Sequence, residues 1–161
     1  MGNHSVHVIH TPGHSAGHCS FYFPDIGIVY LGDIDLSSFG PFYGYLDSHI
    51  DLFIKSIDRV KKLDFNLAVT SHKEVFRDRS EVLEKLDRYR DKIFEREDKL
   101  LEFLKQDRTL EEIVAEAIIY GTFPEPKAMY ELMEKTMIAK HLERLISSGR
   151  ITATPNGYIA K

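Results

Sequence analysis

The first part of the chain, residues 1–76, alternates short apolar runs with turns rich in Gly, Pro, Asp and Ser. Runs of this length between such turns are typical of buried strands. Strands are predicted at residues 6–10, 19–23, 28–31 and 66–70. Residues 48–62 carry apolar side chains at spacings of three and four, which predicts an amphipathic helix. Strands that alternate with a helix favour a layered α/β sheet.

The second part, residues 80–161, has the pattern of charged amphipathic helices followed by a hairpin. Ser80 is a candidate N-cap for a long helix that ends at about residue 105. The segment Thr109–Glu112 has the spacing of a capping box, which predicts a short helix to about residue 117. Further helix and a hairpin that turns on Asn156-Gly157 are predicted at residues 128–148 and 150–160.

Helices followed by a terminal hairpin are the order of a winged-helix module. The change of pattern indicates two domains, at residues 1–79 and 80–161. Basic side chains in and near the penultimate helix could touch nucleic-acid phosphates: Lys135, Lys140, His141, Arg144, Arg150 and Lys161. Glu131, Glu134 and Glu143 interrupt these cations, which favours a protein-contact or dimer-forming module over nucleic-acid binding.

The composition is that of an ordinary globular protein, with 161 residues, 43% hydrophobic side chains and a formal net charge of −4. This charge gives no basic field that would concentrate the protein on nucleic acid or an anionic membrane. No segment has the roughly 20 apolar residues that a membrane-spanning helix needs, and the N-terminus lacks the pattern of a signal peptide. The single cysteine, Cys19, fits a reducing compartment. We expect a cytoplasmic protein without membrane contacts.

Three chemically distinctive side chains follow predicted strands at the points where the strands end. His14 lies in a turn built from Pro12 and Gly13, directly after the first strand. Asp33 and His72 each come directly after another predicted strand. Imidazole and carboxylate groups held rigidly at strand ends are suited to binding a metal ion. The three side chains are therefore candidate metal ligands.

The order of these motifs resembles the metallo-β-lactamase superfamily. The motifs that carry the resemblance are His-Thr-Pro-Gly-His-Ser at residues 10–15, Gly-Asp at 32–33 and Ser-His at 71–72. It covers residues 1 to about 76 and implies the C-terminal half of an αββα fold, followed here by a helical, winged-helix-like module. It also implies that His14 binds a first metal, that Asp33 bridges two metals and that His72 binds the second.

The resemblance further implies a cofactor and a reaction. One or two ions, commonly zinc and in some members iron or manganese, generate a hydroxide that attacks an ester, thioester, amide or phosphodiester. The family's signature His-x-His-x-Asp-His, which supplies further ligands, is absent, and His4-Ser5-Val6-His7 has the wrong spacing to replace it. The three candidates would give each metal one unshared ligand and one shared carboxylate. A catalytic zinc normally has three protein ligands, so this set is too small. We expect a hydrolase fragment that lacks the N-terminal part, binds metal weakly and catalyses little.

Other residues near these motifs are candidates for supporting roles. His18 is a candidate to orient the metal-ligand loop instead of binding metal itself. Asp35, two residues beyond Asp33, could support that ligand or serve as a turn carboxylate. The aromatic loop at residues 37–45 could line a substrate pocket or pack on the fold. Its candidate pocket residues are Phe39, Phe42 and Tyr43.

Two hypotheses about function follow. The first is a metal-dependent hydrolase whose substrate is a small acyl compound, such as a thioester, or RNA. The second is a non-catalytic assembly or nucleic-acid-binding protein that uses the helical module, and metal content separates the two. Because the unpaired edge of an interior strand at residues 6–10 would seek a partner, we also expect a homodimer or higher oligomer.

Overall fold

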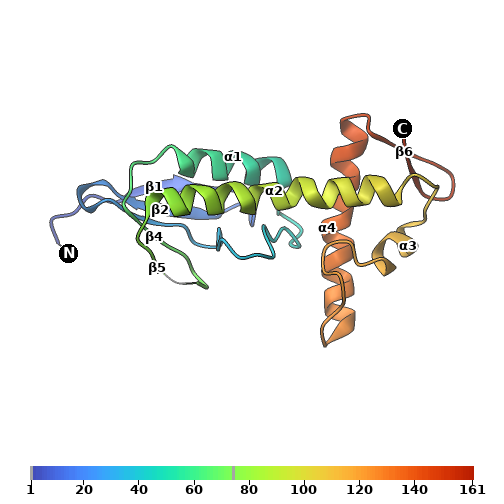
Figure 1. The fold of residues 1–161 in the computed structure, drawn as a ribbon, viewed down its shortest axis with the longest axis horizontal. Coiled ribbons are helices and arrows are strands. Elements are labelled where there is room, and N and C mark those ends of the chain that lie inside the picture. The colour runs from blue at the N-terminus through green and yellow to red at the C-terminus, as the bar shows by residue number, and fades with distance from the viewer. Residues whose placement is uncertain (1, 74) are drawn as a thin grey trace. The chain divides into compact units, whose positions relative to one another are not determined.

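The structure, a computed structural model, describes residues 2–73 and 75–161 and contains mixed α and β elements (Figure 1). In chain order these are β1 (His7–His10), β2 (Cys19–Phe23), the short helix η1 (Pro24–Ile26), β3 (Ile28–Tyr30), α1 (Ile50–Lys61), β4 (Leu67–Val69), β5 (Val75–Phe76), α2 (Arg79–Phe103), α3 (Leu110–Ala115), α4 (Lys127–Ser147), β6 (Ile151–Ala153) and β7 (Tyr158–Ala160). The α/β class and the helical C-terminal part are confirmed.

The chain packs as two compact units that divide within α2. One unit holds the residues up to 43 together with 47–93, and the other holds 44–46 and 94–161. The division therefore lies after residue 93, whereas the sequence predicts a domain boundary after residue 79. Because α2 is one continuous helix of 25 residues, its pattern carries no break that could mark this division.

The first unit is built on a five-stranded sheet with the order β1-β2-β3-β4-β5. Neighbouring strands are antiparallel except β3 and β4, which are parallel and are connected through α1. The four predicted strands are confirmed to within one residue at each end. The sequence pattern missed β5, because a strand of two residues is too short to show an alternation.

One face of this sheet lies under α1 and the first half of α2, which run together over it in Figure 1. The rings of Phe53 in α1 and Tyr89 in α2 meet edge to face, with centroids 6.1 Å apart. Beneath them, Val29 and Ala68 of the central strands are fully buried. The opposite face carries Val8, Phe21 and Val75 from three strands, and these side chains are 63%, 37% and 44% exposed.

The start of α2 corrects the predicted cap. The helix begins at Arg79, and the carboxylate of Asp78 accepts hydrogen bonds from the backbone N–H and the hydroxyl of Ser80. These hydrogen bonds also lower the pKa of Asp78. Ser80 therefore lies inside the first turn and Asp78 supplies the capping oxygen, because a carboxylate one position outside the helix reaches the orphan N–H group.

The second unit has a core of its own between the end of α2, α3, α4 and the hairpin of β6 and β7. Its buried apolar residues are Leu100, Leu104, Ile113, Ile118, Ile138, Leu142, Leu145 and Ile151. The capping box at the start of α3 is confirmed, since Thr109 and Glu112 exchange hydrogen bonds between side chain and backbone. The hairpin is also confirmed. The winged-helix arrangement of these elements stays a prediction.

Basic residues of α4 are engaged within this unit. His141 is fully buried, and its Nδ1 lies 3.4 Å from Oε1 of the buried Glu97. Arg144 donates to the same oxygen, and Arg150 lies 3.7 Å from the other. Burial acts to raise the pKa of Glu97, but the hydrogen bonds from His141 and Arg144 outweigh it and lower that pKa. His141 is thus a core residue, which removes it from the possible phosphate contacts of the less favoured nucleic-acid alternative.

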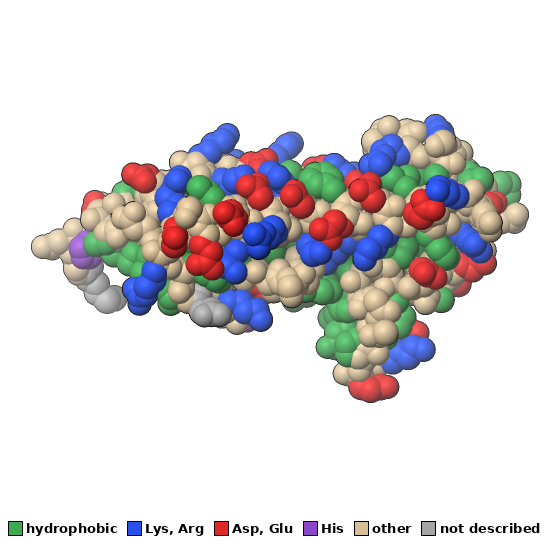
Figure 2. Space-filling view, viewed as in Figure 1, with side chains coloured by type: hydrophobic (Ala, Val, Ile, Leu, Met, Phe, Trp, Pro, Cys, Tyr) green, Lys and Arg blue, Asp and Glu red, His purple; other side chains and the backbone are tan. Residues whose placement is uncertain are grey.

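The surface of the helices is electrically mixed. Acidic and basic side chains alternate over α1 and α2 on the face seen in Figure 2. Several of them form ion pairs one helical turn apart along α2, including Glu81 with Lys85 and Glu84 with Arg88. None of the helices in the described part of the chain combines the length and apolarity that crossing a membrane requires.

Candidate functional site

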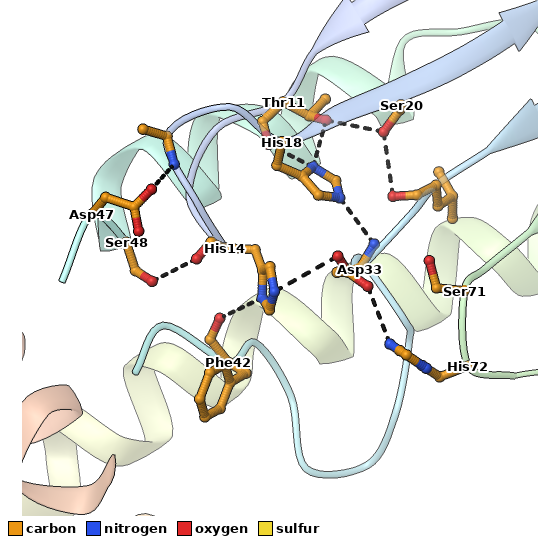
Figure 3. A network of polar contacts seen from close by, with 12 residues as sticks. Thr11, His14, His18, Ser20, Asp33, Phe42, Asp47, Ser48, Ser71 and His72 are labelled. Carbon is orange, nitrogen blue, oxygen red and sulfur yellow. Dashed lines mark hydrogen bonds and ion pairs between the residues drawn. The ribbon is translucent and has the colours of Figure 1, made fainter. Parts of the chain in front are cut away.

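The three candidate metal ligands meet at one edge of the five-stranded sheet, close to the ends of β1, β3 and β4 (Figure 3). Nε2 of His14 lies 3.7 Å from Oδ2 of Asp33, and Nε2 of His72 lies 3.2 Å from Oδ1 of the same carboxylate. Each imidazole therefore faces a different oxygen of Asp33. The side chain of His72 is exposed and those of His14 and Asp33 are half-buried, so solvent reaches the site.

The ring of His14 is oriented by the loop that follows Asp33. Its Nδ1 lies 3.1 Å from the backbone carbonyl oxygen of Phe42. The ring centroids of His14 and Phe42 are 5.8 Å apart. Because a carbonyl oxygen only accepts, Nδ1 carries the hydrogen of this bond and Nε2 is directed toward Asp33. A backbone acceptor behind the imidazole is the usual support of a histidine that binds metal through its other nitrogen.

The loop that carries His14 is fastened to the start of α1. Ser48 donates its hydroxyl to the backbone oxygen of His14, and the N–H of His49 donates to the carbonyl of Gly13. Gly13 has a φ of +144°, and a Cβ built there would lie 2.3 Å from Cα of Phe53. Only glycine allows the loop to lie this close to the helix, so the turn places His14 rigidly.

His18 lies behind the candidate ligands and is 8% exposed. Its Nε2 accepts a hydrogen bond from the backbone N–H of Asp33 at 2.9 Å, and its Nδ1 lies 2.9 Å from the backbone oxygen of Thr11. The hydroxyl of the buried Thr11 completes the cluster by contacting Nδ1 and Ser20. Burial lowers the pKa of His18. Both ring nitrogens are used within the protein, which supports the expected supporting role of His18 and leaves neither for a metal.

The remaining predicted site residues have mixed positions. Asp35 accepts a hydrogen bond from the backbone N–H of Ser37 at 3.1 Å, so the turn-carboxylate alternative describes its contact. Phe42 is half-buried beside His14. Tyr43 is fully buried in the core, so the alternative that the loop packs on the fold describes this residue, and its role in a substrate pocket stays a prediction. Phe39 is half-buried, and its role in a pocket stays a prediction.

Two supporting features of the site were not predicted from the sequence. The hydroxyl groups of Tyr30 and Ser71 lie 2.8 Å apart next to His72. Asp47 accepts from the backbone N–H of Ala16 at 2.9 Å and so ties down the far side of the His14 loop. The Ser-His motif places Ser71 beside a candidate ligand and was a usable signal, whereas no local pattern pairs Asp47 with a loop 31 positions away.

The donor atoms are of the types that bind a metal ion, but there are too few of them to hold one. Imidazole nitrogen and carboxylate oxygen are ligands that zinc takes in proteins, and both histidines direct Nε2 at Asp33. Within residues 2–73 and 75–161, however, no group of three or more His, Cys, Asp or Glu side chains is arranged to hold a metal ion. The set therefore places one imidazole on each side of a shared carboxylate.

The sequence matches known proteins over its first part. Residues 1–72 match the family model described as the metallo-beta-lactamase superfamily. A curated hydroxyacylglutathione hydrolase from Chelativorans sp. is 52% identical over 33 residues, which are 20% of this chain and 13% of that protein. The chain thus covers a small share of this relative's length.

Solved structures share the fold over nearly the whole chain. A metallo-beta-lactamase family protein from Thermus thermophilus has a TM-score of 0.76 at 24% identity, covering 97% of this chain and 49% of that one. A beta-lactamase domain protein from Burkholderia ambifaria has a TM-score of 0.75 at 18% identity, covering 100% and 49%. This chain spans about half the length of both. Residues 1–72 belong to the metallo-beta-lactamase superfamily, and the chain has the fold of that superfamily's solved members.

Proposed function

We propose that this chain is part of a metal-dependent hydrolase and that His14, Asp33 and His72 are its contribution to a two-metal centre. The observation that carries the proposal is the orientation of the three side chains. The two Nε2 atoms face opposite oxygens of one carboxylate at 3.7 and 3.2 Å. A carboxylate approached from both sides has the arrangement of a bridging ligand, which two-metal hydrolytic centres use.

Zinc is the ion that we propose, with iron and manganese as alternatives. A bound divalent ion makes water a stronger nucleophile and polarises the bond that is attacked. The chain's own residues orient the ligands, since the Phe42 carbonyl accepts from His14 and thereby directs Nε2 toward Asp33. A catalytic zinc normally has three protein ligands, so further ligands are needed from outside this set. On its own the chain is expected to bind metal weakly and to be weakly active.

We propose a small acyl compound, such as a thioester, as the substrate class. The similarity to a hydroxyacylglutathione hydrolase over 33 residues supports an acyl substrate. The half-buried aromatic ring of Phe42 beside His14 offers an apolar contact for such a molecule. RNA is the less favoured alternative, because Arg144 and Arg150 are engaged in ion pairs with the buried Glu97.

Metal titration tests the proposed ligands. We would titrate the chain with Zn²⁺ by calorimetry and measure bound metal by elemental analysis, for the natural sequence and for Asp33→Asn and His14→Ala. Each substitution removes a ligand and should weaken zinc affinity about tenfold or more, since even outer contacts of a metal site change affinity by 10–100-fold. The control is His4→Ala, an exposed histidine outside the site, which should leave the affinity unchanged.

Bound zinc and hydrolytic activity, measured with an added segment, decide between the hydrolase and a non-catalytic protein. We would add a separately produced segment that carries His-x-His-x-Asp-His from a structural relative and measure bound zinc and thioester hydrolysis again. Both should rise, and the Asp33→Asn variant should not respond. Absence of bound metal with and without the added segment would contradict the hydrolase proposal and favour an assembly role.

A further inference from the structure

One peptide group connects the segments that carry the three proposed ligands. The C=O of Gly32 and the N–H of Asp33 belong to the same planar unit. Its N–H donates to Nε2 of His18 at 2.9 Å, and its C=O accepts from the backbone N–H of Ser71 at 3.0 Å. His18 lies at the end of the His14 loop, and Ser71 directly precedes His72. The Gly32–Asp33 peptide group thus contacts the segments on both sides of it.

The hydrogen bonds of His18 define which tautomer its ring adopts. Nε2 accepts from the N–H of Asp33, so the ring hydrogen is on Nδ1. Nδ1 then donates to the backbone oxygen of Thr11 at 2.9 Å. The N–H of Thr11 in turn donates to the carbonyl of His18 at 2.9 Å and closes the loop around His14. The His18 ring therefore connects the closed loop to the backbone N–H of Asp33 by direct hydrogen bonds.

The contact between His18 and this peptide group needs glycine at position 32. Gly32 has a φ of +61°, a left-handed conformation that other residues adopt at a cost. A Cβ built on Gly32 would lie 2.5 Å from Nε2 of His18, closer than van der Waals contact. Any side chain at position 32 would push the imidazole of His18 away from the N–H of Asp33 and break their hydrogen bond.

We infer that His18 is a positioning residue that, through the Gly32–Asp33 peptide group, sets the distances between the Asp33 carboxylate and the imidazoles of His14 and His72. The statement that the three side chains bind metal rests on the proposed function. The statement that His18 holds the Asp33 backbone rests on the hydrogen bonds alone. His18 touches neither metal nor substrate. It acts by fixing the backbone from which the bridging carboxylate projects, while Ser71 fixes the same group from the His72 side.

Two substitutions of His18 separate the hydrogen bond that Nε2 accepts from Asp33 from the one that Nδ1 donates to Thr11. In His18→Gln, the amide oxygen can take the place of Nε2 and accept from the Asp33 N–H. In His18→Asn, the shorter amide can take the place of Nδ1 and donate to Thr11, but nothing reaches Asp33. Hydrogen exchange measured by NMR on the full chain should accelerate at the Asp33 amide in the Asn variant and stay slow in the Gln variant. Exchange at Ala68, in the sheet core, should stay slow in both and reports that the fold is intact.

Titration with Co²⁺ alone, followed by its visible absorption, provides the second readout. The Asn variant should bind Co²⁺ about tenfold more weakly than the natural sequence, the size of effect expected for a supporting contact. The Gln variant should bind within about threefold of it, because the acceptor is restored. Equal affinities for all three proteins, or equal losses in both variants, would overturn the positioning role.

Failure of the proposed function gives a different result from failure of this inference. If Asp33→Asn leaves Co²⁺ affinity unchanged, Asp33 is no ligand and the metal proposal fails. The exchange rates still decide whether His18 holds the Asp33 backbone in that case. If Asp33→Asn weakens binding while the Asn and Gln variants at position 18 behave alike in both readouts, the function stands and the inference is wrong.

Discussion

Gly32 illustrates how a residue without a side chain controls the geometry of the site. Replacement by Ala would impose a left-handed backbone on an L-residue and drive its Cβ to 2.5 Å from His18. We expect Gly32→Ala to lower the free energy of unfolding by roughly 3 kcal/mol, the sum of conformational strain and overpacking. Urea unfolding followed by circular dichroism measures this change.

A second glycine provides the matched control for Gly32→Ala. Gly121 also has a positive φ, +72°, but apart from its own chain neighbours no atom of the described residues lies within 4 Å of the position that a Cβ would take there. Gly121→Ala should therefore cost only the backbone strain, about 1 kcal/mol. Similar losses in the two variants would mean that the contact with His18 contributes nothing.

At the residue scale, the sequence predicted those parts of the site that a local motif carries. His14, Asp33 and His72 each follow a strand within a recognisable turn, and the structure brings them together. The carbonyl of Phe42 could not be foreseen, because every residue has such a group and only the packing of its loop aims this one at His14. The burial of Tyr43 likewise depends on that packing.

At the element scale, we expect the contact between His141 of α4 and Glu97 of α2 to make stability depend on pH. His141 is fully buried beside Glu97, and burial lowers the pKa of His141, outweighing the hydrogen bond with Glu97 that acts to raise it. The unfolded chain therefore binds a proton on His141 at about pH 6.5, whereas the folded chain binds it only at lower pH. The free energy of unfolding should be at its full value above about pH 6.5 and should decrease as pH falls toward the folded pKa.

The substitution His141→Asn tests this pH dependence, since Asn can still donate to Glu97 but does not titrate. Urea unfolding between about pH 5 and pH 8 should show a shallower dependence of the free energy of unfolding on pH for this variant. The exposed residue His4 supplies the control, and His4→Asn should keep the slope of the natural sequence. Parallel curves for the natural sequence and His141→Asn would exclude His141 as the source.

Most elements could be predicted because their patterns are local. The strands, α1 and the capping box of α3 rest on apolar spacing and on polar residues at fixed offsets, and all are present. The cap of α2 was wrong by two positions because Asp78 and Ser80 are both good capping residues, and sequence alone does not decide which one lies outside the helix.

At the scale of the whole molecule, the two compact units have separate cores, and α2 contributes residues to both. Every member of the second core lies within residues 94–161. We expect a fragment of residues 94–161 to fold by itself, with a cooperative thermal transition in circular dichroism. A fragment of residues 80–161 would add the start of α2, whose buried side chains Val82 and Leu86 belong to the first unit.

The comparison of these fragments tests where the domain boundary lies. The longer fragment should self-associate in sedimentation experiments, because its added apolar residues would lack their sheet. The shorter one should remain monomeric, and Leu142→Ala within it should lower the free energy of unfolding by about 2–5 kcal/mol. A shorter fragment that melts without cooperativity would favour the boundary after residue 79 instead.

The double hydrogen bonding of the Gly32–Asp33 peptide group also bears on how this sequence can vary. Because His18 and Ser71 act on the two ends of one rigid unit, the effect of changing one of them depends on the state of the other. Substitutions here should be non-additive, so that a replacement harmful alone is compensated by a second one in a distant segment. Positions 18, 32 and 71 should therefore be inherited as combinations and not as independent choices.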